Sequence, residues 1–98
     1  MHVIARSKLI EFWKKHPDAE VPLRTWFTKV NKAKWKNFHD VKKDFPSADQ
    51  VGNSRVVFDI RGNEYRMVCL VFFSGQKAYI RFIGTHSAYD KIKDIKNI

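Results

Sequence analysis

Long apolar runs and paired cysteines are both missing from this chain of 98 residues. No stretch approaches the roughly 18 consecutive apolar residues of a membrane-spanning helix, so we expect no insertion into a membrane. The first residues also lack the basic stretch and apolar core of a secretory signal. Cys69 is the only cysteine and has no partner for an internal disulfide, which is typical of a reducing compartment. Together these absences predict a cytoplasmic protein.

The patterns that hold a metal ion or a nucleotide cofactor are missing as well. None of the four histidines has the spacing or the cysteine company of a zinc site. Gly62 and Gly75 lie in turn-forming stretches, without the helix that must directly follow a phosphate-binding loop. Cys69 lies among apolar residues, which favours a place in the core over a role as nucleophile. We therefore expect neither a metal nor a cofactor.

Positive charge is what the chain has in excess. Its 19 Lys and Arg against 10 Asp and Glu give a formal net charge of +9, and cations outnumber carboxylates in both halves. Such a balance favours a polyanionic partner, which could be RNA, DNA or an acidic protein surface. Lysines that solvate ordinary helix faces would produce the same excess, so charge alone does not select the partner. The length allows a single core, and we expect one domain over residues 1–98.

The N-terminal half has the apolar spacing of helices. A short strand over residues 1–5 precedes a predicted helix with Ser7 as its N-cap, which ends at Pro17. A second helix is predicted where apolar residues recur at i, i+3, i+4 and i+7, namely Leu23, Trp26, Phe27 and Val30. A third, shorter helix is expected over residues 35–45 and is stopped by a proline, after which residues 46–49 form a loop.

The C-terminal half changes to a period of two. Three strands are predicted over residues 55–60, 64–73 and 77–85, and their short connections require antiparallel neighbours. A closing helix starts near Ser87 and Asp90, which match a serine-x-x-acid capping pattern, and continues through Ile92 and Ile95. The predicted fold is α+β, a twisted antiparallel sheet covered on one face by the N-terminal helices, with a short C-terminal helix.

Strand alternation predicts which residues of the last strand share a face. Tyr79, Arg81 and Ile83 are expected on one face, and the apolar set on the other face is expected to be core: Ala78, Ile80 and Phe82.

Arg66 of the middle strand and Arg81 of the last strand are the isolated cations among these hydrophobic residues. If the hairpin register aligns them, the two guanidiniums meet on the uncovered face, where a phosphate bound by both would offset their repulsion. The alternative is that each arginine pairs with a nearby carboxylate, Asp59 or Glu64.

The junction after the last strand supplies further candidates for phosphodiester chemistry. His86 lies where strand gives way to helix and can exchange a proton near neutral pH, although it could also only pin the first turn. Tyr89 could stack on a base or pack against the sheet. Asp90 is more typical of a helix cap than of a catalytic group, and Lys91 is placed to touch phosphate.

Three blocks of the sequence resemble the HigB toxins of bacterial type II toxin–antitoxin systems: residues 45–49, 57–68 and 79–91. Two elements within them are specific in combination, Gly-Asn-x-Tyr-Arg ending at Arg66 and Arg-x-x-x-Thr-His-x-x-Tyr-Asp beginning at Arg81. The resemblance implies a RelE-like fold and a ribosome-dependent endoribonuclease that cleaves translated mRNA without a metal and leaves a 2′,3′-cyclic phosphate. It also implies a HigA-type helix-turn-helix antitoxin, a heterotetrameric complex, and contact with operator DNA only through the antitoxin.

Carried over to this chain, the resemblance implies a catalytic set and a set of RNA contacts. The catalytic set is Arg66, Arg81, His86 and Tyr89, and the predicted RNA contacts are Arg61, Tyr79, Asp90 and Lys91. Relatives often have glutamate where this chain has Ala88, so we expect Ser87 and Asp90 to cap the helix instead. Two other functions remain open at this point, a ParE-like inhibitor of DNA gyrase without nuclease activity and a non-catalytic RNA-binding module.

Overall fold

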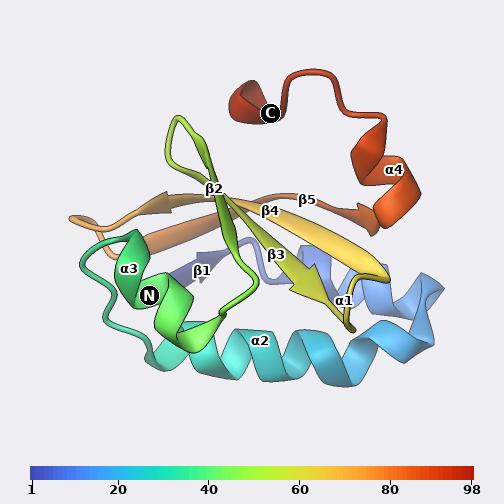
Figure 1. Cartoon of the computed structure of the whole chain (residues 1–98). Helices are drawn as coiled ribbons and strands as arrows, with labels where there is room; N and C mark the ends of the chain where they lie inside the picture. Colours follow the sequence, from blue (N-terminus) through green and yellow to red (C-terminus); the bar gives the residue numbers. More distant parts are fainter.

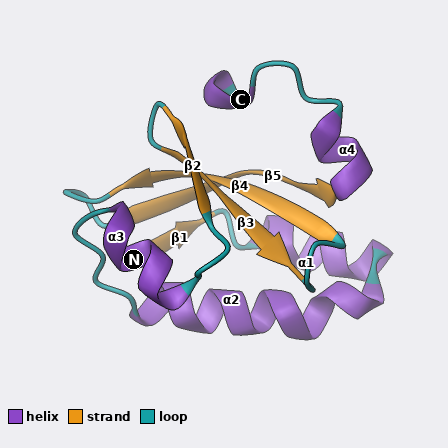
Figure 2. Cartoon of the chain, viewed as in Figure 1, coloured by secondary structure: helices purple, strands orange, loops and turns teal.

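The computed structural model describes all residues 1–98, and its N-terminal part is a helical layer (Figures 1 and 2). A short strand, β1 (His2–Ile4), leads into α1 (Ser7–Lys15), the 3-10 turn η1 (Pro17–Ala19), α2 (Glu20–Lys32) and α3 (Phe38–Asp44). Leu23, Trp26 and Val30 of α2 are buried, which confirms the apolar face predicted from their spacing. The structure places the N-cap of α1 at Arg6 and makes Ser7 the first helical residue, so the helix begins one position earlier than predicted.

Five strands form one sheet with the order β1-β5-β4-β3-β2. They are β1, β2 (Asp49–Gly52), β3 (Arg55–Ile60), β4 (Tyr65–Phe72) and β5 (Lys77–Thr85). The predicted α+β fold is confirmed, but β1 runs parallel to β5, so the sheet is mixed. Strand β2 lies partly where a loop was expected, because an exposed edge strand of polar residues carries no apolar alternation.

The helices cover one face of this sheet, here called the helix-covered face (Figure 1). Trp26 of α2 packs edge-on against Phe58 of β3, with 5.5 Å between ring centroids, and Tyr65 of β4 donates a 2.5 Å hydrogen bond to Asp18 of η1. Every residue of the core cluster with less than a tenth of its surface exposed is apolar or aromatic. Burial of this kind is the main stabilising contribution to the fold. No helix is long and apolar enough to span a membrane.

A β-bulge in β5 reverses the alternation predicted for that strand. Val68 of β4 pairs with Phe82, whereas the next residue, Cys69, pairs with Ile80, so Arg81 is the extra residue. Ile83 therefore faces the helix-covered core, and Phe82 lies on the opposite face. The prediction that Phe82 shares the core face with Ile80 is wrong, because one inserted residue moves every later side chain to the other face.

The opposite face of the sheet, here called the second face, is not left uncovered. After α4 (His86–Asp90) the chain crosses over this face and ends in the 3-10 turn η2 (Ile95–Asn97), on the side away from α1 and α2 (Figure 1). Val57 and Val68, whose side chains point to the second face, are 2% and 0% exposed. The expected closing helix through Ile92 and Ile95 is thus shorter than predicted, and residues 91–98 serve as a cover.

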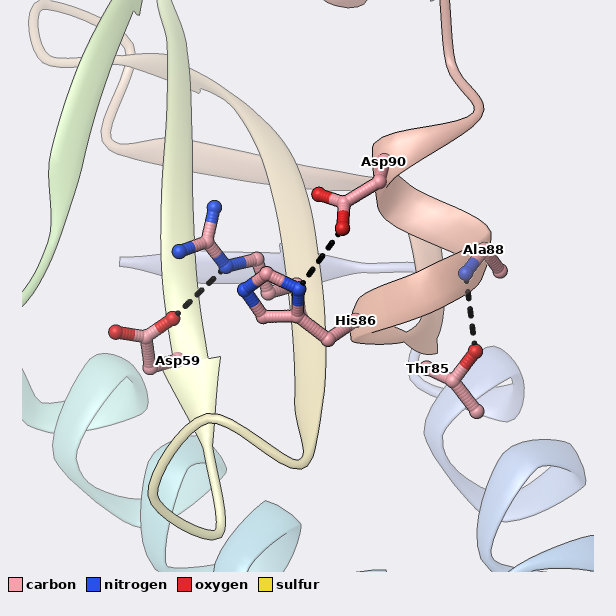
Figure 3. Close-up of polar contacts among 6 residues, drawn as sticks. Asp59, Thr85, His86, Ala88 and Asp90 are labelled. Atoms are coloured by element: carbon pink, nitrogen blue, oxygen red, sulfur yellow. Dashed lines mark hydrogen bonds and ion pairs between the residues drawn. The ribbon is translucent and has the colours of Figure 1, made fainter.

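Thr85 caps α4, in place of the predicted Ser87 and Asp90. The Thr85 hydroxyl accepts a 3.0 Å hydrogen bond from the Ala88 backbone N–H, so the N-terminal cap forms without a glutamate at position 88 (Figure 3). Asp90 is the last helical residue and cannot serve as the N-terminal cap. Its carboxylate is therefore available for another contact.

Cys69 is fully buried on the helix-covered face, as the sequence indicates. Burial raises the pKa of its thiol far above the ordinary value, which suppresses the thiolate that a nucleophile requires. We predict that Cys69→Ala costs about 1–2 kcal/mol in the free energy of unfolding through the small cavity it leaves. Biological activity should be unchanged once folding is confirmed; urea unfolding measures the first effect and a growth-inhibition assay in cells measures the second.

Candidate active site

The centre of the candidate site is Arg66 on the second face. The β3–β4 hairpin turns at Arg61 and Gly62, both with positive φ, and this turn places Asp59 directly opposite Arg66. The Nε atom of Arg66 lies 3.1 Å from Oδ1 of Asp59, and both side chains are about one-fifth exposed, at 22% and 21% (Figure 3). The contact is an ion pair without hydrogen-bond alignment, because the buried Nε has no aligned acceptor.

Asp59 approaches Arg66 at Nε, and neither terminal Nη group makes a hydrogen bond to a carboxylate. A guanidinium held in this way can present its two Nη groups to a phosphate as a fork. The alternative considered from sequence, pairing of Arg66 with Asp59, is therefore confirmed, and it is compatible with phosphate binding.

Tyr89 of α4 packs on the same guanidinium. The Cζ atom of Arg66 lies 4.7 Å from the centre of the Tyr89 ring, which is a cation–π contact. The Tyr89 ring is also 6.5 Å from Phe82, the residue that the bulge moves to the second face. Tyr89 therefore packs against the sheet, which was one of the two expectations for this residue.

His86 is fixed at the first position of α4. Its backbone N–H donates to the Glu64 carbonyl at 3.2 Å, and its Nδ1 lies 3.2 Å from Oδ2 of Asp90, one turn later (Figure 3). With the proton on Nδ1, the Asp90 carboxylate holds the ring in one tautomer and leaves Nε2 able to accept a proton. The His86 and Tyr89 rings are 6.4 Å apart, so the histidine belongs to the cluster around Arg66.

Arg81 does not belong to this cluster. Arg66 pairs with Gly84 in the sheet, three residues from Arg81, and the Arg81 Nε atom donates to the Ile98 backbone oxygen at 3.2 Å. The hairpin register therefore does not align Arg66 with Arg81, which the hypothesis of one clamp required. The arginine that does share an oxygen with Arg81 is Arg55.

The predicted RNA contacts are distributed around the sheet. The Nη1 atom of Arg61 lies 3.4 Å from Oδ2 of Asp18 and 3.8 Å from Oε2 of Glu64, at the end of the sheet next to η1. Tyr79 packs edge-on against Phe72 at 5.9 Å, toward the far end of the second face. Lys91 directly follows α4 and is exposed. Of these residues, Lys91 and Asp90 lie beside the Arg66 cluster.

Two residues of the second face were missed by the sequence prediction. Arg55 shares its face with Val57 and Asp59 by simple alternation, so a signal for it was present in the strand pattern. The position of Phe82 depends on the bulge, which leaves no local signal in the sequence. No group of three or more His, Cys, Asp or Glu side chains is arranged to hold a metal ion.

Gly84 provides space for the aromatic packing of the site. A Cβ atom at this position would lie 2.6 Å from Cζ of Phe82, so Gly84→Ala must displace the Phe82 ring, which packs toward Tyr89. We predict a loss of about 1–3 kcal/mol in stability from overpacking and about a tenfold loss of toxicity. Gly75→Ala is the matched control, because its Cβ would meet nothing within 4 Å. Thermal unfolding and growth inhibition measure the two effects, and equal behaviour of both variants would contradict the packing role.

Comparison with known proteins places this arrangement in a class. Residues 19–92 match the HigB toxin family, described as the RelE-like toxic component of a toxin-antitoxin system, and the mixed sheet with helices on one face is consistent with that class. The chain belongs to the HigB toxin family, as its sequence motifs predict, and an antitoxin is accordingly its partner.

Relatives with curated names support the assignment. The "mRNA interferase toxin HigB" of Escherichia coli strain K12 is 36% identical over 92 residues, which cover 92% of this chain and 88% of the relative. The "mRNA interferase HigB" of Shigella flexneri has the same identity and coverage. A further "mRNA interferase HigB", from Escherichia coli O6:H1, is 23% identical over 94 residues that cover 94% of this chain and 91% of the relative.

Proposed function

We propose that this toxin is an endoribonuclease that cleaves mRNA during translation on the ribosome and thereby inhibits protein synthesis. The names of its relatives, which describe mRNA interferases, support this proposal. The net charge of +9 suits a phosphodiester substrate. The observation that carries the proposal is the cluster of Arg66, Tyr89 and His86, in which a cation, an aromatic ring and an imidazole lie together on the second face.

The proposed reaction uses the RNA 2′-hydroxyl as nucleophile and needs no metal. The 2′-oxygen attacks the adjacent phosphorus as its proton passes to Nε2 of His86, and the bond from phosphorus to the 5′-oxygen breaks. Solvent water gives a proton to the leaving 5′-oxygen while the proton held by His86 passes to solvent, and the products are a 2′,3′-cyclic phosphate and a 5′-hydroxyl end. The Nη groups of Arg66 stabilise the additional negative charge on the phosphoryl oxygens in the transition state.

Carboxylates position both reacting side chains in this mechanism. Asp59 holds the guanidinium of Arg66 by its Nε atom, and Asp90 holds the imidazole of His86 by its Nδ1 atom. Neither carboxylate touches the RNA in this scheme. Tyr89 packs on the face of the guanidinium, and its partly exposed ring can also stack on a base.

The wider set of RNA contacts follows the positive surface. Lys91 is placed to meet a phosphate beside the cluster, while Arg61 and Tyr79 would contact nucleotides or ribosomal RNA further along the sheet. An active site this small leaves orientation of the message to the ribosome. We place the reaction in the cytoplasm, where translating ribosomes are found.

The antitoxin is proposed to be a HigA-type helix-turn-helix protein. It would bind this toxin in a heterotetramer and contact the operator DNA of their shared operon itself, with no toxin–DNA contact. A strongly basic toxin favours an acidic surface on that partner.

The deciding experiment maps the 5′ ends of a message by primer extension after the purified toxin is added to a translating extract. New 5′ ends that require translation, and that Arg66→Ala fails to produce, would support the proposal. Arg24→Ala is the matched control, because it removes a guanidinium from α2, where Arg24 pairs with Glu20 at 2.8 Å. Intact message with accumulating double-strand DNA breaks would instead indicate inhibition of gyrase, and intact message with neither effect would indicate RNA binding alone.

A further inference from the structure

Two arginines on the second face converge on a single oxygen atom. The Arg55 Nη2 group donates to the Ile98 backbone oxygen at 2.7 Å, and the Arg81 Nε group donates to the same oxygen at 3.2 Å. Neither guanidinium lies within ion-pair distance of an aspartate or glutamate, unlike Arg24, Arg61 and Arg66. The residues come from β3 and β5, on either side of β4.

The two guanidiniums are not fully satisfied by these contacts. Arg55 also donates from Nη1 to the Asn53 carbonyl at 2.8 Å, but its buried Nε has no hydrogen-bond partner. Two guanidiniums near one oxygen repel each other, and a buried donor without an acceptor is costly. A phosphodiester group has two free oxygens and can offer one to each guanidinium, whereas both now donate to a single oxygen of Ile98.

The location of the pair relates it to the Arg66 cluster. Gly84, the ladder partner of Arg66, is three residues from Arg81 along β5, so the two arginines are about 10 Å apart by strand geometry. Arg66 and Arg81 lie on the same sheet. The cover of residues 91–98 starts beside Arg66 and ends at Arg81. A strand of RNA with its scissile phosphate at Arg66 could therefore place a neighbouring phosphate at Arg81.

Apart from the two arginine contacts at Ile98, the far end of the cover is held by long hydrogen bonds. Asn53 donates from Nδ2 to the Lys96 carbonyl at 3.4 Å and to Oδ1 of Asn97 at 3.3 Å, both long hydrogen bonds on exposed atoms. Such contacts contribute little to stability, so a ligand with greater affinity for the two arginines can replace the Ile98 oxygen.

We propose that Arg55 and Arg81 form a second phosphate-binding site for the substrate RNA, and that the cover, residues 91–98, occupies it through Ile98 in the free toxin. RNA binding then exchanges the Ile98 oxygen for a phosphodiester group next to the one that is cleaved. The inference rests on the proposed function, since it takes the substrate to be single-stranded mRNA.

The test measures binding of a short single-stranded 2′-O-methyl RNA, which cannot be cleaved, over a series of salt concentrations. Arg55→Ala and Arg81→Ala should each weaken binding about 5–10-fold and reduce the slope of log affinity against log salt by about 0.7, the loss of one phosphate contact. Arg55→Lys should keep the slope and lose part of the affinity. Arg24→Ala, in the helical layer, should change neither quantity beyond a small nonspecific decrease.

A second variant tests the displacement of the cover. Asn53→Gly removes both Asn53 side-chain contacts with residues 96 and 97, and glycine accepts the positive φ of 48° at this position. RNA affinity should rise about 2–5-fold, because less binding energy is spent on displacing residues 91–98.

Thermal unfolding first confirms that each variant is folded. An unchanged salt slope in folded Arg55→Ala would overturn the phosphate site, and an unchanged affinity in Asn53→Gly would overturn its occupation by the cover. Failure of the proposed function is separable, because it would appear as intact message with wild-type toxin in the translating extract while the binding results stand.

Discussion

Replacement of Arg66 by alanine is expected to reduce message cleavage by about 10²–10³-fold. The guanidinium of Arg66 is held by a carboxylate at Nε and an aromatic ring at its face, with 3.1 Å to Asp59 and 4.7 Å to the Tyr89 ring centre. Donors fixed before the reaction stabilise transition-state charge without reorganisation, and loss of one such group costs rates of this size. The measurement is the yield of new 5′ ends per ribosome in a translating extract.

The same substitution also affects the fold, and the two effects can be separated. Asp59 is 21% exposed, so loss of its partner should lower the free energy of unfolding by about 1–2 kcal/mol. The double variant Arg66→Ala with Asp59→Ala should recover part of that stability but none of the cleavage. Arg66→Lys keeps the charge without the fork and should retain only a small fraction of the activity. Full cleavage by folded Arg66→Ala would contradict the proposed mechanism.

The elements predicted from sequence are those that depend on side chains close together in the chain. The apolar spacing of Leu23, Trp26 and Val30 is enough to define α2 and the side it buries. Strand β3 matches its predicted range of 55–60, because period-two alternation and the turn at Gly62 are both local. The parallel pairing of β1 with β5 joins residues about 75 positions apart, as in His2 with Lys77, and no local pattern carries that information.

The same distinction between local and long-range features applies to the candidate site. The pairing of Asp59 with Arg66 follows from a short hairpin, and sequence reasoning did include it as an alternative. The role expected for Arg81 beside Arg66 depended on the hairpin register, and the sheet pairs Arg66 with Gly84 instead. The strand also contains a bulge at Arg81, which depends on how the whole sheet packs and leaves no local signal in the sequence.

The N-terminal cap of α4 forms although this chain has Ala88 where relatives often have glutamate. Asp90 was predicted to take part in the cap because Ala88 replaces the usual glutamate. In the structure the Thr85 hydroxyl caps the helix alone. Since Asp90 is not needed as a cap, its carboxylate pairs with His86. The two carboxylates of the site, Asp59 and Asp90, thus have the same kind of task, each holding one reacting side chain in place.

Replacement of His86 by alanine is the second substitution with a large expected effect, a loss of roughly 10²-fold or more in cleavage. The imidazole has its Nδ1 atom directed to Asp90 at 3.2 Å, which leaves Nε2 to take the 2′-hydroxyl proton. Rates of cleavage measured with stalled ribosome complexes test this expectation.

Asp90→Asn is the variant that distinguishes a positioning role from a structural one. The amide keeps the size of the side chain and can still accept from Nδ1, but it removes the charge that stabilises the imidazolium, so we expect a loss of about tenfold. Its side chain is 61% exposed, and stability should change by less than about 0.5 kcal/mol. A lower kcat at unchanged KM in Asp90→Asn, with unchanged unfolding, would support the His86–Asp90 pair. Full activity in folded His86→Ala would remove histidine from the reaction and leave Arg66 and the ribosome to account for catalysis.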